Sequence, residues 1–168
     1  MMRRRAVLAA LGLVALATVL QVTLFADVRP LGAAPELPLL MVVVLSQFLR
    51  TEPAMLVGFL AGLITDLQGD SLLGSWALVC TVVAFLGTRL ASRAEGNPLL
   101  LGAGVFGLTV IGDLFFLMIG TLFGQHELAG RHLLRTLTLA AIYNVVLAIG
   151  LIPLTAKAVG FRTQEGWR

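Results

Sequence analysis

The stretch Gly58-Phe-Leu-Ala-Gly-Leu-Ile-Thr-Asp66, followed by Leu67-Gln-Gly-Asp-Ser-Leu-Leu-Gly74, decides the fold of this chain. An apolar run with two glycines four residues apart ends on an acid, and a short polar turn leads into the next apolar run. Residues four apart lie on one helix face, and glycines on that face allow a second helix to approach closely. The pattern therefore predicts two membrane helices that pack along a small-residue seam and are joined by an acidic hairpin.

Five residues of this stretch form a candidate site for packing or for partner binding: Gly58, Gly62, Asp66, Leu73 and Gly74. Asp66 continues the glycine face to the edge of the membrane. Asp70 and Ser71 lie where a helix start needs acceptors for its free N–H groups, so we expect them to cap the following helix. For the two glycines, internal packing and contact with a partner protein remain equally open.

The composition excludes an ordinary soluble domain. Of the 168 residues, 58% are hydrophobic and only 12% are charged, and the mean hydropathy is +0.97. A soluble domain has about 25% charged residues, and long uncharged runs are typical of membrane spans. We therefore predict an all-α, polytopic transmembrane helix bundle, with residues 1–168 forming a single integral-membrane domain.

Polar and proline-containing breaks divide the chain into about six apolar segments. The expected spans are residues 6–26, 37–49, 54–67, 72–90, 99–123 and 132–156. The first follows a basic start but is too long for the apolar core of a signal peptide. The second and third are short, at roughly 20 Å each for 1.5 Å per residue, against a hydrocarbon core of about 30 Å. Two short crossings are favoured over a re-entrant hairpin.

The distribution of basic residues predicts that both termini lie in the cytoplasm. With six spans, nine of the twelve Lys and Arg residues fall on the side of the N-terminus, and three, Arg29, Arg131 and Arg135, fall on the other side. This asymmetry agrees with the positive-inside rule. The re-entrant alternative moves only Arg50 across, so the orientation does not depend on that choice.

No catalytic, cofactor or metal constellation is recognisable in the sequence. His126 and His132 are six residues apart, which is not the spacing of a helical metal pair. The single cysteine, Cys80, has no partner for an internal disulfide. The basic residues lie at segment ends, as orientation signals do, and do not indicate nucleic-acid binding. We expect a protein without enzymatic activity, cofactor or metal.

Asp113 is the most informative polar residue, because it lies inside the fifth apolar segment. A carboxylate near the centre of a membrane helix costs about 2.5–3.5 kcal/mol on insertion scales, so it should face protein or water. It is either a ligand, partner or proton site, or a packing residue that is bonded to a neighbouring helix. The pair Tyr143-Asn144, in the sixth segment, is at a depth where it could supply that bond.

The block of Gly58, Gly62, Leu63, Asp66, Leu73 and Gly74 resembles the most recognisable motif of the MreD family of rod shape-determining membrane proteins. In that family a glycine, three residues, Gly-Leu, two residues and Asp precede a short turn and Leu-Gly. The resemblance extends over nearly the whole chain in length, number of spans and the shortness of the second and third spans. Asp113 has no counterpart in the motif.

The resemblance implies a non-enzymatic scaffold subunit of the cell-elongation complex in the bacterial inner membrane. The family acts beside the bitopic protein MreC and, through it, the actin-like MreB, the RodA polymerase and its transpeptidase partner, a class B penicillin-binding protein. It helps to couple cytoskeletal filaments to peptidoglycan synthesis and so maintains rod shape. Surrounding lipids are the other expected partners.

The resemblance also leaves a second function open. The family is similar in fold to the substrate-binding subunits of energy-coupling-factor vitamin transporters. The alternative is therefore a small-molecule-binding transport subunit that uses Asp113, Asn144 and the loop from Asp66 to Ser71 as polar contacts in an apolar pocket.

Overall fold

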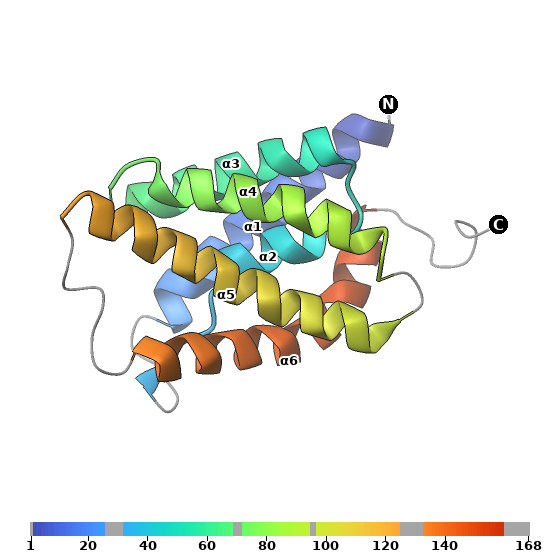
Figure 1. Cartoon of the computed structure of the whole chain (residues 1–168). Coiled ribbons are helices and arrows are strands. Elements are labelled where there is room, and N and C mark those ends of the chain that lie inside the picture. The colour runs from blue at the N-terminus through green and yellow to red at the C-terminus, as the bar shows by residue number, and fades with distance from the viewer. Residues whose placement is uncertain (1, 26–31, 69–71, 95–96, 125–132, 160–168) are drawn as a thin grey trace.

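The computed structural model describes residues 2–25, 32–68, 72–94, 97–124 and 133–159, with no side-chain detail for 2–5 and 133. In these ranges the chain forms six α-helices and no strand. They are α1 (Met2–Leu24), α2 (Leu37–Ser46), α3 (Thr51–Gln68), α4 (Ser75–Ala91), α5 (Pro98–Leu122) and α6 (Leu133–Val159). Successive helices run in opposite directions (Figure 1). The prediction of an all-helical membrane bundle is confirmed.

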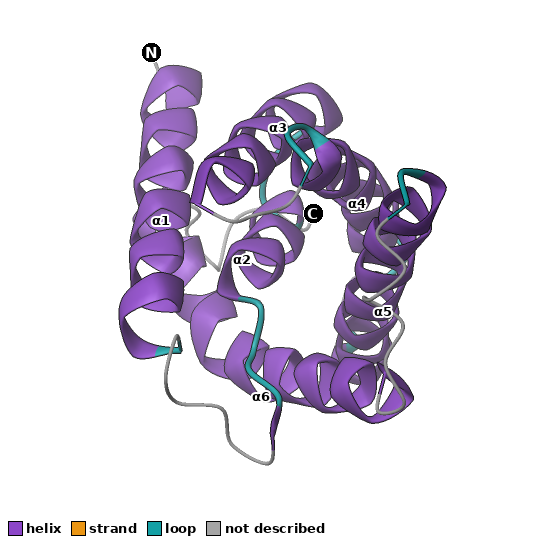
Figure 2. Cartoon of the chain, turned by 90° about the vertical axis from the view of Figure 1, so that its left-hand side faces the viewer, coloured by secondary structure: helices purple, strands orange, loops and turns teal. Residues whose placement is uncertain are grey.

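The short helix α2 is the centre of the bundle. Figure 2 shows it inside a ring formed by the other five helices, and it packs against every one of them. All ten of its residues are buried. Because no side of α2 faces outward, its sequence is apolar all round, as expected for a fully enclosed helix.

The outer helices bury only one stripe each. On α3 the buried residues are Ala54, Val57, Gly58, Ala61, Gly62 and Asp66, which recur at helical spacing. The opposite face carries exposed apolar side chains such as Leu56 and Phe59. In a protein that spans a membrane these faces meet lipid, so their exposure does not imply instability.

Within the ranges that the structure describes, three helical segments are long and apolar enough to cross a membrane: Ala6–Leu24, Pro98–Leu122 and Leu134–Val159. The apolar helices Leu37–Ser46 and Ser75–Ala91 are shorter. The number of crossings, and the choice between two crossings and a re-entrant hairpin for α2 and α3, therefore stay predictions.

Several helix boundaries differ from the expected spans. The helix expected from residue 72 begins at Ser75, because Leu72, Leu73 and Gly74 form the turn before it. The helix expected from residue 54 begins at Thr51, so that Glu52 and Pro53 form part of its first turn. Proline has no N–H to lose in a first turn, and an acid there interacts favourably with the helix dipole.

Candidate functional site

The glycine pair of α3 packs directly against α4. A Cβ atom on Gly58 would lie 2.6 Å from the carbonyl oxygen of Cys80, and one on Gly62 would clash with the backbone of Trp76 and Ala77. The obstructing atoms belong mainly to backbone, which cannot move aside as a flexible side chain could. The structure thus places the seam inside this chain, between α3 and α4, which make the most extensive contact in the bundle.

Asp66 closes the seam by accepting hydrogen bonds from the first turn of α4. Its carboxylate oxygens accept from the backbone N–H groups of Gly74 at 3.0 Å, Trp76 at 3.1 Å and Ala77 at 3.1 Å. The Ser75 hydroxyl adds a longer contact of 3.4 Å to Oδ1. The residue is 1% exposed. A negative charge at a helix N-terminus is stabilised both by the free N–H groups and by the helix dipole.

The residues that follow have different roles. Gly74 is the residue before α4 and has φ = +95°, in the left-handed region that favours glycine. Leu73 is 74% exposed and takes no part in the seam. The expected capping residues Asp70 and Ser71 lie outside the described residues, and the acceptor observed at the start of α4 is Asp66 of the preceding helix.

A second polar cluster surrounds the start of α2. Asn144 of α6 accepts a hydrogen bond from the backbone N–H of Glu36 at 3.1 Å and donates one to the Thr109 hydroxyl of α5 at 3.2 Å. Gln21 of α1 accepts from the backbone N–H of Leu37 at 2.9 Å. Two helices, α1 and α6, therefore each satisfy one free donor at the start of α2, which has no side-chain cap from its own N-cap residue, Glu36.

Asp113 belongs to the same cluster but is not bonded to Asn144, so the bond suggested by their shared depth is not formed. Its carboxyl group instead lies beside that of Glu36. Asp113 is 4% exposed, and neither of its oxygens has a hydrogen-bond partner among the described residues. Among those residues no group of three or more His, Cys, Asp or Glu could hold a metal ion.

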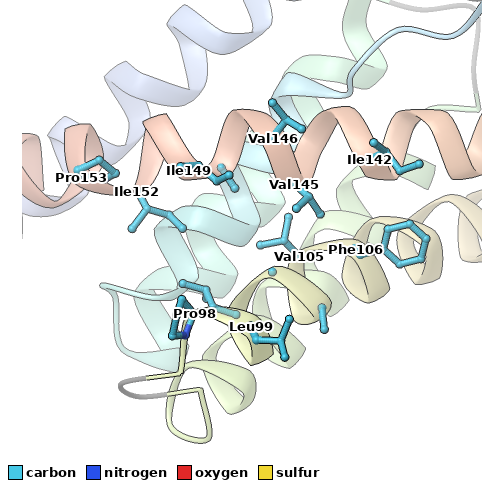
Figure 3. Close-up of a pocket in the computed structure, with 14 residues that line it drawn as sticks. Pro98, Leu99, Val105, Phe106, Ile142, Val145, Val146, Ile149, Ile152 and Pro153 are labelled. Atoms are coloured by element: carbon cyan, nitrogen blue, oxygen red, sulfur yellow. The ribbon is translucent and has the colours of Figure 1, made fainter.

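An apolar groove separates α5 from α6 on the outside of the bundle. Its volume is about 740 Å³, and its floor and walls include Gly102, Val105, Phe106, Val145 and Ile149. Figure 3 shows Val105 and Val145 pointing toward one another across it. A Cβ atom on Gly102 would meet only Val145 Cγ1, at 3.9 Å, so there is room for a side chain in the groove.

Sequence reasoning missed Glu36, Thr109 and the groove. Glu36 is an isolated acid between Pro35 and Pro38, at the start of an apolar run. This position was the sequence feature that could have indicated a second buried carboxyl group. Thr109 and the groove have no comparable signal, because a threonine or an apolar residue in a membrane helix can face lipid as readily as protein.

The sequence was compared with known protein families, with curated proteins and with solved structures. The model of the family described as rod shape-determining protein MreD matches residues 2–158. No significant match to a curated protein or to a solved structure was found. The family match covers all six helices except the last residue of α6. The chain belongs to the MreD family of rod shape-determining membrane proteins.

Proposed function

We propose that this protein is a non-enzymatic scaffold subunit of the bacterial cell-elongation complex, in the inner membrane with both termini in the cytoplasm. The observation that carries the proposal is the family match over residues 2–158. The charge distribution supports the orientation. In this role the protein helps to couple cytoskeletal filaments to peptidoglycan synthesis and so to maintain rod shape.

The proposed direct partner is MreC, which links this subunit to MreB, RodA and a class B penicillin-binding protein. A bitopic protein offers one membrane helix for contact, and the α5–α6 groove is a surface suited to receive one. Gly102, Ala103 and Ala148 line it and leave little side chain between the two backbones. Small residues at such a site favour close helix packing in lipid, where van der Waals contact is a main source of stability.

The alternative, a small-molecule-binding subunit of a vitamin-type transporter, has less support. It requires Asp113 and Asn144 to face an open pocket. Asn144 is fully buried and bonded to Glu36 and Thr109 of the same chain. Asp113 is also buried, at 4% exposed, so it does not face an open pocket either.

Affinity purification from native membranes in mild detergent, with mass spectrometry of the recovered proteins, tests the proposal. We expect MreC, RodA and the transpeptidase to co-purify with the tagged protein. Recovery of an ATPase pair with a membrane coupling subunit, and of none of the elongation proteins, would overturn it in favour of the transporter. A parallel purification with an unrelated tagged membrane protein controls for detergent carry-over.

A further inference from the structure

Two acidic side chains from distant parts of the chain lie together inside the bundle. Glu36 precedes α2, and Asp113 lies within α5. Their carboxyl groups are adjacent. Asn144 holds the backbone of Glu36 in place through the N–H bond of 3.1 Å. The pair therefore sits where the segment before α2 enters the bundle.

The oxygens of this pair lack donors. Asp113 Oδ1 and Oδ2 and Glu36 Oε2 are buried without a hydrogen-bond partner among the described residues. An ionised carboxylate is only an acceptor, so two ionised groups cannot bond to each other. Buried unpaired charges are costly, and two like charges at close range add repulsion. The pair as two carboxylates would thus be doubly unfavourable.

The neighbouring elements do not supply a compensating charge. Gln21 of α1 and Asn144 of α6 are neutral and are engaged with backbone or with Thr109. Cys80 of α4 lies near Glu36 and near Asp66 of α3, a further acid, and neither Cys80 nor Asp66 is basic. No basic side chain in the described part of the chain pairs with either carboxyl group.

One bound proton can remove the charge repulsion between these two carboxyl groups and supply a hydrogen-bond donor, for which a metal ion is less suitable. One protonated carboxyl group becomes a donor and can bond to its ionised neighbour, as in other carboxyl pairs that share a proton. A hard metal ion needs about six oxygen ligands. Beyond the pair itself, the nearby side-chain oxygens of Asn144 and Thr109 already take part in hydrogen bonds.

We propose that Glu36 and Asp113 form a proton-binding site that holds one exchangeable proton between them and fastens the start of α2 to α5. Glu36 as a residue is only partly buried, which gives the proton a route out of the bundle. With the proton bound, the O–H group of one acid donates to the other. Its loss leaves two adjacent negative charges, which push the segment before α2 away from α5.

Infrared spectroscopy of the purified full-length protein in lipid nanodiscs tests the proposal directly. We expect the carbonyl band of a protonated carboxyl group at about pH 7, decreasing as the pH rises. The Asp113→Asn and Glu36→Gln variants should each lose this band. Glu52→Gln, which changes an exposed carboxyl group on α3, should retain it. Absence of the band from the wild type at neutral pH would overturn the proposal.

Unfolding as a function of pH gives a second readout. Because the folded state holds a proton that the unfolded state releases, stability should fall as the pH rises. The unfolding constant should increase by up to about tenfold per pH unit. Asp113→Asn should flatten this dependence, since an amide can donate without a charge.

A wild type stabilised by sodium ions at constant pH, with no protonated band, would indicate a cation site and contradict the proposal. If the variants fail to fold, titration of the wild-type band alone decides.

Discussion

At the scale of single residues, Asp66 is the acid on which the α3–α4 hairpin depends. It accepts from three backbone N–H groups at the start of α4, within a buried site. Asp66→Ala removes all three acceptor contacts, and each buried donor left without a partner costs about 1–3 kcal/mol. We therefore expect the free energy of unfolding to fall by at least about 3 kcal/mol, measured by reversible denaturation in detergent.

Asp66→Asn provides the matched comparison. It keeps one carbonyl oxygen for these N–H groups but loses the charge that interacts with the α4 dipole, so its loss should be smaller than that of Asp66→Ala. Equal stability of Asp66→Ala and wild type would contradict a capping role. Both variants leave the exposed face of α3 unchanged, so an effect on partner recovery without an effect on stability would point to a different function for this residue.

The two buried acids differ in how far the sequence predicts them. Asp66 follows the glycines at helical spacing, so its position at the end of the seam could be inferred from the local pattern. The neighbour of Asp113 could not, because Glu36 is remote in the chain and reaches it only through the central position of α2. Long-range pairing of this kind depends on the packing of all six helices, about which local periodicity says nothing.

At the scale of secondary-structure elements, the contact between α3 and α4 depends on the absence of side chains at two positions. Gly62→Leu would force a branched side chain into the Trp76–Ala77 backbone. Because that backbone is held by Asp66, it cannot retreat without breaking the cap. We expect Gly62→Leu to abolish folding or to reduce thermal stability severely, measured by fluorescence-detected size exclusion during heating.

Gly107→Leu is the control for this prediction. Gly107 lies on α5, and nothing is within 4 Å of a Cβ atom placed there. The Gly107→Leu substitution changes helix propensity and side-chain size as Gly62→Leu does, but without a clash. It should therefore leave the elution profile and the melting temperature nearly unchanged. Wild-type behaviour of Gly62→Leu would show that α4 can move away, contrary to the tight seam.

The start of α4 is determined by hydrogen bonds to the preceding helix and not by the hydropathy of the sequence. Apolar residues Leu72 and Leu73 suggested an earlier start for α4, but the carboxylate of Asp66 binds the N–H groups of Gly74, Trp76 and Ala77 and so fixes the first turn at Ser75. On hydropathy alone, Leu72 and Leu73 are assigned to the helix. A hydropathy profile contains no information about Asp66, the side chain of the preceding helix that caps α4.

At the scale of the whole molecule, the arrangement follows from one enclosed helix. A helix that is apolar all round can be a lipid-facing span or the core of a bundle, and hydropathy alone does not separate these cases. Residues 37–49 and 54–67 were both expected to form short spans, so length did not identify which of the two is enclosed. In the structure the enclosed helix consists of the ten buried residues Leu37–Ser46. The other five helices then have one face for α2 and their neighbours and another for lipid or partners.

The outer face of the bundle includes the α5–α6 groove. If a partner helix packs there, a side chain that fills the groove should prevent binding without disturbing the fold. Gly102→Leu satisfies both conditions, because a Cβ atom at Gly102 meets only Val145 at 3.9 Å. We expect this variant to retain its melting temperature while recovering at least about tenfold less MreC, a loss of about 1.4 kcal/mol in binding.

Gly107→Leu, in the same helix but outside the groove, should recover MreC as the wild type does. Equal recovery by both variants would place the partner on another face. The exposed apolar side chains of α1, such as Leu16 and Val19, would then be the next surface to test.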